Sequence, residues 1–227
     1  IGILHDIATP LTAIKGYASG LLDGVAHTAE KQRIYAERIQ RSAATMERLT
    51  ARLREFLRLE SGQMPLTWET ICARDFLVET IRTYTPDFVE QGLHLAMEEI
   101  EIDASIRIDR EEFVRVLKNL WENSSKYRRG DCVQVHMSLA AEGSFLAIRC
   151  DDDGVGVRAE ERIKLFDSFY RTDAARTNVA AGSGLGLAIV RQIMTVFRGS
   201  VRAEESPDGG LRIVLLLPIV PREGGME

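Results

Sequence analysis

The chain has 227 residues, enough for two domains, and its 45% hydrophobic and 28% charged residues are ordinary for a globular protein. No apolar run approaches the roughly 20 residues that cross a bilayer. We expect no signal peptide, and therefore a cytoplasmic protein without membrane contact in this part. The net charge of −5, with no dense basic stretch, argues against nucleic acid as a partner, and the three cysteines have no metal-ligand spacing. Because the sequence starts abruptly within a helical pattern, we expect it to continue upstream.

The first predicted element is an amphipathic helix that runs from the start to about Asp23. Its apolar face is spaced by three or four residues and consists of Ile3, Ile7, Leu11, Ile14, Ala18 and Leu21. At roughly 100° per residue, His5 points away from that face, with Asp6 beside it and Thr9 one turn further on. Pro10 lacks an N–H, so we expect the helix to bend or loosen here. These residues alone fit both a solvated surface histidine and a side chain that other proteins must reach.

A second helix is predicted over 29–59, with Thr28 as its cap and Ser61-Gly62 as its end. Its apolar positions come close to a heptad repeat and are Tyr35, Ile39, Ala43, Met46, Leu49, Leu53 and Phe56 or Leu57. In a single copy of the chain, the apolar stripe of this helical hairpin would remain exposed to solvent. We therefore predict a homodimer through residues 1–60 that forms a four-helix bundle. The alternative is that the stripe packs on the rest of the same chain.

After a linker or short strand at 61–67, helix and strand patterns alternate. The predicted helices span 74–91, 110–127 and about 185–197. The predicted strands span 93–97, 105–108, 133–139, 145–150, 200–204 and 211–217. Pro86 should kink or interrupt the first of these helices, and a long loop is expected from 151 to about 182. The pattern indicates a sheet covered on one face by helices, an α+β sandwich. We divide the chain into domains at 1–62 and 63–222.

The helix at 110–127 carries polar side chains that suit a nucleotide. Asn119 and Asn123 are four residues apart and share a face. An asparagine oxygen can complete a Mg²⁺ shell that is otherwise phosphate and water, and Lys126 can reach phosphate. Taken alone, these residues fit a solvated helix face better than a nucleotide site.

Three later stretches add to this pattern. In CDDDGVGV, at 150–157, Asp152 is placed to accept a hydrogen bond from an exocyclic amine, although a surface turn fits the same residues. Phe166 and Phe169 lie one turn apart in a loop, which suggests that they dock against other residues. AGSGLGLAIV, at 181–190, is a glycine-rich turn that opens a helix and favours phosphate, without the pattern of a Walker or Rossmann loop.

In their order and spacing these stretches resemble sensor histidine kinases over nearly the whole chain. His-Asp-x-x-Thr-Pro-Leu, at 5–11, is similar to the phosphoacceptor box of that family. Asn-x-x-x-Asn, Asp-x-Gly-x-Gly, Phe-x-x-Phe and Gly-x-Gly-x-Gly follow in the family's order. The resemblance implies a dimerisation and phosphoacceptor hairpin followed by a Bergerat-type (GHKL) ATP-binding domain.

The resemblance also implies roles for individual residues. His5 matches the phosphorylated histidine, Asp6 the acidic neighbour that orients its ring and accepts its proton, and Thr9 the residue that helps water attack the phosphorylated partner. ATP would bind with Mg²⁺ at Asn123 and with adenine at Asp152. The remaining matches contact the nucleotide or cradle its phosphates and are Asn119, Lys126, Tyr127, Gly154, Gly156, Phe166, Phe169, Arg171, Gly182, Gly184, Leu185 and Gly186.

The implied activity is autophosphorylation of His5 by ATP, followed by transfer to an aspartate of a response-regulator receiver domain, with phosphatase activity on that regulator left open. The segment at about 167–181 would form a mobile lid over ATP. A membrane anchor in the full-length protein is also left open. Two other classes remain: a signalling scaffold that binds nucleotide or regulator without turnover, and another Bergerat-fold ATPase of the chaperone or mismatch-repair type.

Four positions depart from the family's pattern. Leu4 stands where serine is usual, and Ala8 occupies a position near Thr-Pro where arginine is common. The missing arginine places the efficiency of transfer, or partner docking, in doubt. Val155 replaces a usual proline and should loosen its turn, while Asp153 replaces a common asparagine and adds a negative charge that can weaken ATP binding.

Overall fold

The computed structural model describes residues 2–62, 65–98, 102, 104–172 and 184–221; the side chains of residues 2–6 lie outside this description. The chain divides into two compact units, Ile1–Gln63 and Met64–Glu227. In the described ranges, no helix combines the length and the hydropathy that a membrane span requires.

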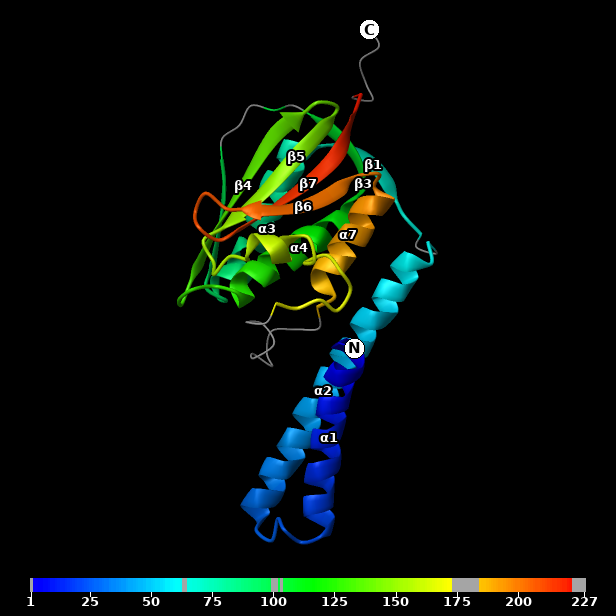
Figure 1. Ribbon diagram of the computed structural model, residues 1–227, viewed down its shortest axis with the longest axis vertical. Helices are drawn as coiled ribbons and strands as arrows, with labels where there is room; N and C mark the ends of the chain where they lie inside the picture. The colour runs from blue at the N-terminus through cyan, green and yellow to red at the C-terminus, as the bar shows by residue number, and fades with distance from the viewer. Residues whose placement is uncertain (1, 63–64, 99–101, 103, 173–183, 222–227) are drawn as a thin grey trace. The chain divides into compact units, whose positions relative to one another are not determined.

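The first unit is an antiparallel hairpin of two helices, α1 (Gly2–Leu22) and α2 (Ala29–Glu60), which lie side by side (Figure 1). Thr28 caps α2 as predicted, because its Oγ1 accepts a hydrogen bond from the Lys31 N–H at 3.2 Å. The chain leaves α2 through Gly62, whose φ of +65° is the left-handed conformation of a helix end. The predicted helical hairpin is therefore confirmed.

The apolar seam of the hairpin is only partly covered. Tyr17 and Tyr35 pack edge to face with their ring centroids 5.2 Å apart, and Gly20 leaves room for the Tyr35 ring. All the predicted seam positions of α2 from Tyr35 to Phe56 remain partly exposed. Pro10 does not interrupt α1, which continues through it.

The second unit contains a seven-stranded mixed sheet. Its strands are β1 (Trp68–Cys72), β2 (Leu93–Met97), β3 (Ser105–Asp109), β4 (Val133–Glu142), β5 (Phe145–Asp152), β6 (Ser200–Glu205) and β7 (Leu211–Val220). They lie in the order β1-β3-β7-β5-β4-β2, and β6 also pairs with β7. All pairs are antiparallel except β2 with β4.

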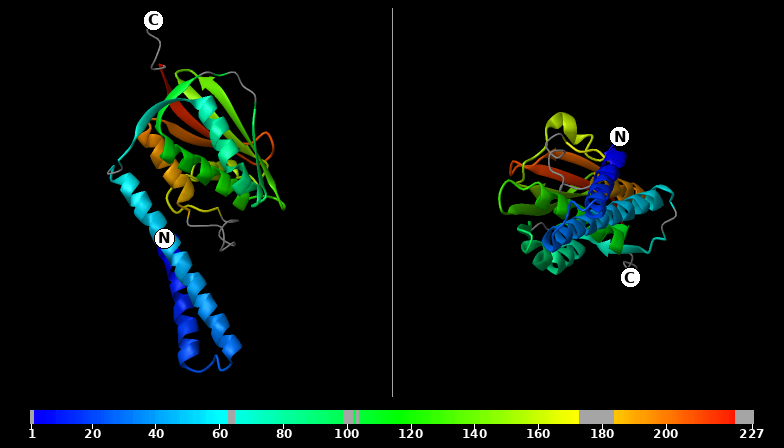
Figure 2. Two further views of the ribbon diagram at one scale, coloured as in Figure 1. Left: turned by 180° about the vertical axis from the view of Figure 1, so that it is seen from behind. Right: turned by 90° about the horizontal axis from the view of Figure 1, so that it is seen from below.

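Three helices cover one face of this sheet (Figure 2): α3 (Ala73–Val89), α4 (Arg110–Lys126) and α7 (Gly186–Val196). Asp109 caps α4 as predicted, because its Oδ1 accepts from the Glu112 N–H at 3.0 Å. Between helices and sheet lies an apolar core whose largest fully buried side chain is Trp121. The predicted α+β sandwich is confirmed.

Three details differ from the prediction. A short strand was one alternative for 61–67, and the structure places the edge strand β1 directly after that segment, where only its last three residues are partly buried. Pro86 does not interrupt α3, which continues to bury Phe88 beyond the proline. The expected long loop after β5 contains the short helix α5 (Ala159–Arg162).

Candidate nucleotide site

The first part of the site is the contact between α4 and the start of α7. A Cβ built on Gly186 would lie 3.1 Å from Asn119 Oδ1 and 3.9 Å from Asn123 Nδ2. Asn119 also donates from Nδ2 to the backbone oxygen of Arg115 at 3.0 Å, which fixes its amide. The structure thus brings the two predicted asparagines and the predicted glycine turn together, although they are more than 60 residues apart in sequence.

Asp152 lies at the end of β5 and is 8% exposed. Its Oδ1 accepts hydrogen bonds from the backbone N–H groups of Gly154 and Leu211 at 3.0 and 2.9 Å. Its Oδ2 accepts a hydrogen bond from the Ser124 hydroxyl at 2.9 Å. A carboxylate offers about four acceptor positions, so three donors leave one for an amine.

Burial raises the pKa of the Asp152 carboxyl above its usual value, because the charged form loses hydration. The three hydrogen bonds to the carboxylate oppose this rise, and the neighbouring negative charge of Asp153 adds to it. The ionised form therefore depends on these donors, and removing one of them would raise the pKa further.

Two glycines of the acidic stretch approach other backbone closely. A Cβ on Gly154 would lie 2.7 Å from the backbone oxygen of Tyr127, and Gly156 has a φ of +68°. Val155 donates its N–H to the same Tyr127 oxygen at 2.9 Å. The usual proline could not make this bond, so the expected loosening of the turn by Val155 is wrong: the valine ties it to the end of α4.

The carboxylate of Asp153 is directed at β4. The Gln134 N–H donates to Asp153 Oδ1 at 2.9 Å, and the Asp153 N–H donates to the Gln134 backbone oxygen at 3.3 Å. Together these bonds extend the β4–β5 ladder by one residue. Asparagine has the same acceptor oxygen, so the departure preserves this contact while adding charge.

A tight turn at 206–210 closes over Asp152. A side chain at Gly210 would collide with the backbone and carboxylate oxygens of Asp152. Arg129 holds the turn from the other side by donating from a guanidinium nitrogen to the Gly209 backbone oxygen at 2.6 Å. The next N–H after the turn, on Leu211, is the one that binds Asp152.

The loop that carries Phe166 and Phe169 contacts the glycine-rich turn at Gly184 through its backbone. Phe169 has an unusual φ of +66° and donates its N–H to the Gly184 backbone oxygen at 3.0 Å. A Cβ on Gly184 would lie 2.8 Å from the Tyr170 backbone oxygen. Phe166 and Leu185 are buried, at 6% and 1% exposure, so docking of the loop is confirmed for Phe166.

The remaining predicted nucleotide contacts lie at the end of α4 and before residue 173. Burial raises the pKa of Tyr127, and the positive charge of Arg171 opposes that shift, which places the two side chains within electrostatic reach. Lys126 Nζ lies 3.6 Å from Glu122 Oε2.

Several predictions fall outside the described residues: Gly182, the lid segment from 173 onward, and the side chains of His5 and Asp6. Thr9 is described and is exposed on α1.

Sequence reasoning missed three groups that bind or abut Asp152: Ser124, Gly210 and the Leu211 N–H. A signal existed for the first, because Ser124 directly follows Asn123 in the pattern that singled out α4. The other two come from the turn at 206–210 between the predicted strands 200–204 and 211–217, to which the sequence alone assigned no role.

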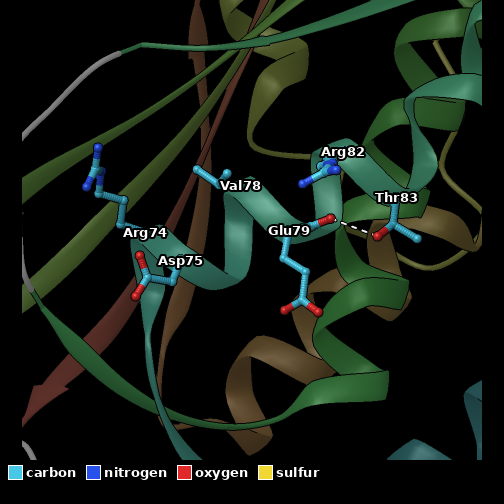
Figure 3. A pocket seen from close by; sticks show the side chains of 6 residues that line it. All are labelled: Arg74, Asp75, Val78, Glu79, Arg82 and Thr83. Carbon is cyan, nitrogen blue, oxygen red and sulfur yellow. Dashed lines mark hydrogen bonds between the residues drawn. The ribbon is translucent and has the colours of Figure 1, made fainter.

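A surface hollow of about 580 Å³ lies along one face of α3 (Figure 3), lined by Arg74, Asp75, Val78, Glu79, Arg82 and Thr83. Thr83 donates to the Glu79 backbone oxygen at 2.8 Å, and Glu79 pairs with Arg110 at 3.1 Å. None of the predicted nucleotide residues lines this hollow, so it is distinct from the Asp152 site. Within the described residues, no group of three or more His, Cys, Asp or Glu side chains could hold a metal ion.

Two family descriptions match the chain. The His Kinase A (phospho-acceptor) domain matches residues 2–62, and the Histidine kinase-, DNA gyrase B-, and HSP90-like ATPase matches residues 108–221. The second of these matches implies that the unit binds ATP.

Individual proteins are similar over almost the whole chain. The Sensor histidine kinase CpxA of Escherichia coli (strain K12) is 31% identical over 222 residues, which cover 97% of this chain and 46% of CpxA. The Autoinducer 2 sensor kinase/phosphatase LuxQ of Vibrio parahaemolyticus is 27% identical over 225 residues, covering 96% of this chain and 26% of LuxQ. The chain thus spans about a quarter to a half of the length of these relatives. Among solved structures, the Acinetobacter baumannii histidine kinase AdeS has the same fold, with a TM-score of 0.67 at 20% identity over 96% of this chain and 98% of that chain.

Proposed function

Because the chain belongs to the sensor histidine kinases, we propose that it transfers the γ-phosphoryl group of ATP to His5 and then to an aspartate of a response-regulator receiver domain. The observation that carries the proposal is the pairing of a phospho-acceptor domain containing His5 with an ATPase domain in one chain. LuxQ, a relative, is named as a kinase and phosphatase, and we extend the proposal to dephosphorylation of the regulator with Thr9 assisting a water.

In the proposed first step, a nitrogen of the His5 imidazole attacks the γ-phosphorus as the bond to the ADP oxygen breaks. Asp6 orients the ring and accepts its proton, which leaves the attacking nitrogen with its lone pair. Neutral imidazole is available because the ordinary pKa of histidine is about 6.5. Catalysis of such a transfer consists mostly of positioning and of neutralising the phosphate charge.

ATP would lie between α4, the end of β5 and the start of α7. We propose that Asp152 accepts a hydrogen bond from the adenine amine and that Asn123 is the Mg²⁺ ligand, supported by Asn119. A ligand set of phosphate, water and one asparagine suits Mg²⁺, which usually keeps several waters and uses few protein ligands. The proximity of both asparagines to Gly186 supports this assignment, because phosphates would then meet the N-terminus of α7.

The phospho-acceptor unit would act as a homodimer through residues 1–60. The support for this is the partly exposed seam of α2, which offers apolar surface that a second hairpin can cover. A domain boundary near residue 62 would separate this dimerising unit from the ATP-binding unit. We further propose that this part of the protein works in the cytoplasm, where it meets ATP and the regulator.

The test is incubation with radiolabelled ATP and Mg²⁺, followed by acid and alkali washes. We expect label that is lost in acid, kept in alkali and absent from His5→Gln. The matched control is His27→Gln, because His27 is the other histidine of the first unit and lies in the exposed turn between α1 and α2. Label that depends on His27, or label that survives in both variants, would move the acceptor away from His5.

The same experiment separates the two other functions. A scaffold would bind ATP without incorporating label, and an unrelated Bergerat-fold ATPase would hydrolyse ATP equally well in His5→Gln. The carboxylate of Asp153 accepts a hydrogen bond from the Gln134 N–H that asparagine would accept equally, so this departure keeps the local contact and adds only a negative charge.

A further inference from the structure

The hydroxyl of Ser124 has two acceptors within reach. It lies 2.9 Å from Asp152 Oδ2 and 3.3 Å from the Leu120 backbone oxygen. Leu120 is one turn earlier in α4, so its oxygen already accepts the regular helical hydrogen bond. A hydroxyl has a single proton to donate, and the shorter contact to a charged acceptor is the stronger one. The proton therefore points to Asp152.

This bond completes the hydrogen bonding of one side of the carboxylate. Oδ1 already accepts two backbone N–H groups, from Gly154 and Leu211, so both of its acceptor positions are filled. Oδ2 has one position filled by Ser124 and one remaining. The carboxylate is thus held at both oxygens, with its last acceptor position on Oδ2.

We propose that Ser124 is a positioning residue for nucleobase recognition, which directs the remaining acceptor position of Asp152 Oδ2 at an exocyclic amine. The proposal rests on the proposed function, because it assumes that Asp152 reads the base. Beyond that function, we assign Asp152 Oδ2 as the oxygen that accepts from the base and Ser124 on α4 as the side chain that orients it. Ser124 is 5% exposed, so bulk water does not replace its hydroxyl.

The chemical consequence is selection of an amine over a carbonyl. An ionised carboxylate accepts only, so it binds the amine of adenine and repels the carbonyl that guanine has at the same ring position. A protonated carboxyl can donate to that carbonyl, and the discrimination then falls. Ser124 opposes protonation, since a donor to the carboxylate favours its charged form.

Other ionisable groups lie next to Asp152 in the chain or on the elements beside it. They are Cys150 and Asp151 on β5, Asp153 after it, Tyr127 at the end of α4, and Arg212 on β7. Arg212 is engaged by Asp151, with Nε and a terminal nitrogen at 2.6 and 3.0 Å from the two carboxylate oxygens. Burial and the two nearby aspartates raise the pKa of Cys150, so its thiol stays neutral.

The test is Ser124→Ala in the whole chain, with ADP and GDP binding measured by calorimetry in the presence of Mg²⁺ from pH 5 to 8. The matched control is Ser125→Ala, the next residue of α4, whose hydroxyl makes only a long contact of 3.4 Å to the Gln91 backbone oxygen. Protonation of the nucleotides themselves affects all three proteins equally.

We expect Ser124→Ala to weaken ADP binding about fivefold at pH 7.5, a loss of part of one charge-assisted hydrogen bond. As the pH is lowered, the loss of ADP affinity should begin at a higher pH in Ser124→Ala than in the wild type. The ratio of ADP affinity to GDP affinity should likewise start to fall at a higher pH in this variant. Ser125→Ala should match the wild type in each respect.

Two results would overturn the proposal: unchanged affinity and pH profile in Ser124→Ala, or a loss of affinity that is the same at every pH and parallels a lower melting temperature. The second result would mean a purely structural serine. Failure of wild-type protein to bind ADP would instead contradict the proposed ATP site itself, so the two failures are distinguishable.

Discussion

The two units of this chain use their apolar side chains differently. In α2, a helix of 32 residues, Leu59 is the only residue that is buried among those the structure describes. In α4, a helix of 17 residues, six are buried, among them Phe113, Leu117 and Trp121. The ATPase unit therefore completes its own core, while the hairpin leaves a seam available. This difference supports the proposed association of the first unit with a second copy.

The largest expected effect is on ATP binding by the second unit. Asp152→Asn should weaken ATP binding by about 100-fold, because the amide that replaces Oδ2 would present donors to the adenine amine. Calorimetry measures the affinity, and circular dichroism should show an unchanged helix content of the whole chain. Binding within a factor of about three of wild type would show that Asp152 does not read the base.

The next effect tests the hairpin. Ala43→Asp places a carboxylate on the partly exposed seam, and we expect it to weaken dimerisation roughly 100-fold, since two unpaired charges would be desolvated. Ala44→Asp is the matched control, because Ala44 is exposed on the opposite side of α2. Sedimentation velocity across a dilution series separates the variants, while ATP binding should stay unchanged in both. Equal behaviour of the two variants would show that the seam is not the interface.

The contrast between the units also explains what the sequence could predict. Both helices of the hairpin follow from apolar spacing and from local end signals, Thr28 and Gly62, which act within a few residues of chain. The sandwich and most of its strands follow from alternation in the same way. The position of edge strand β1 could not be predicted, because its first two residues are exposed and its burial does not alternate along the strand.

In the candidate site, too, local sequence patterns could be predicted and contacts between distant residues could not. Asn123 and Asp152 could be identified because each belongs to a recognisable local pattern. Ser124 stands beside Asn123 in the same pattern. However, its hydrogen bond to Asp152 spans 28 residues of sequence and that of the Leu211 N–H spans 59, so neither bond could be predicted. Val155 shows the reverse error: a residue that differs from a pattern was expected to loosen a turn, and its N–H instead binds Tyr127.

A smaller effect tests the turn that closes over Asp152. Gly210→Ala should lower the free energy of unfolding of the ATPase unit by about 2 kcal/mol, because the added methyl group would overlap Asp152. Urea denaturation measures this loss. Gly130→Ala is the control, since a Cβ there meets no atom within 4 Å, and we expect a change below about 0.5 kcal/mol. A Gly210 variant as stable as the control would mean that the turn moves freely.

The smallest expected effect concerns the charge beside Asp152. Asp153→Asn keeps an acceptor for the Gln134 N–H but removes a negative charge that raises the pKa of Asp152. With this charge gone, the pKa of Asp152 falls, the carboxylate stays ionised to lower pH, and ADP binding should persist to lower pH than in the wild type. At pH 7.5 the affinity should change by about twofold or less, because Asp152 is then ionised in both proteins.

The direction of this shift is the informative part. Ser124→Ala removes a donor and should move the acid limb of ADP binding to higher pH, whereas Asp153→Asn removes a like charge and should move it to lower pH. Opposite shifts from these two substitutions would identify Asp152 as the group whose ionisation governs binding. Shifts in the same direction would assign the pH dependence to another group of the site.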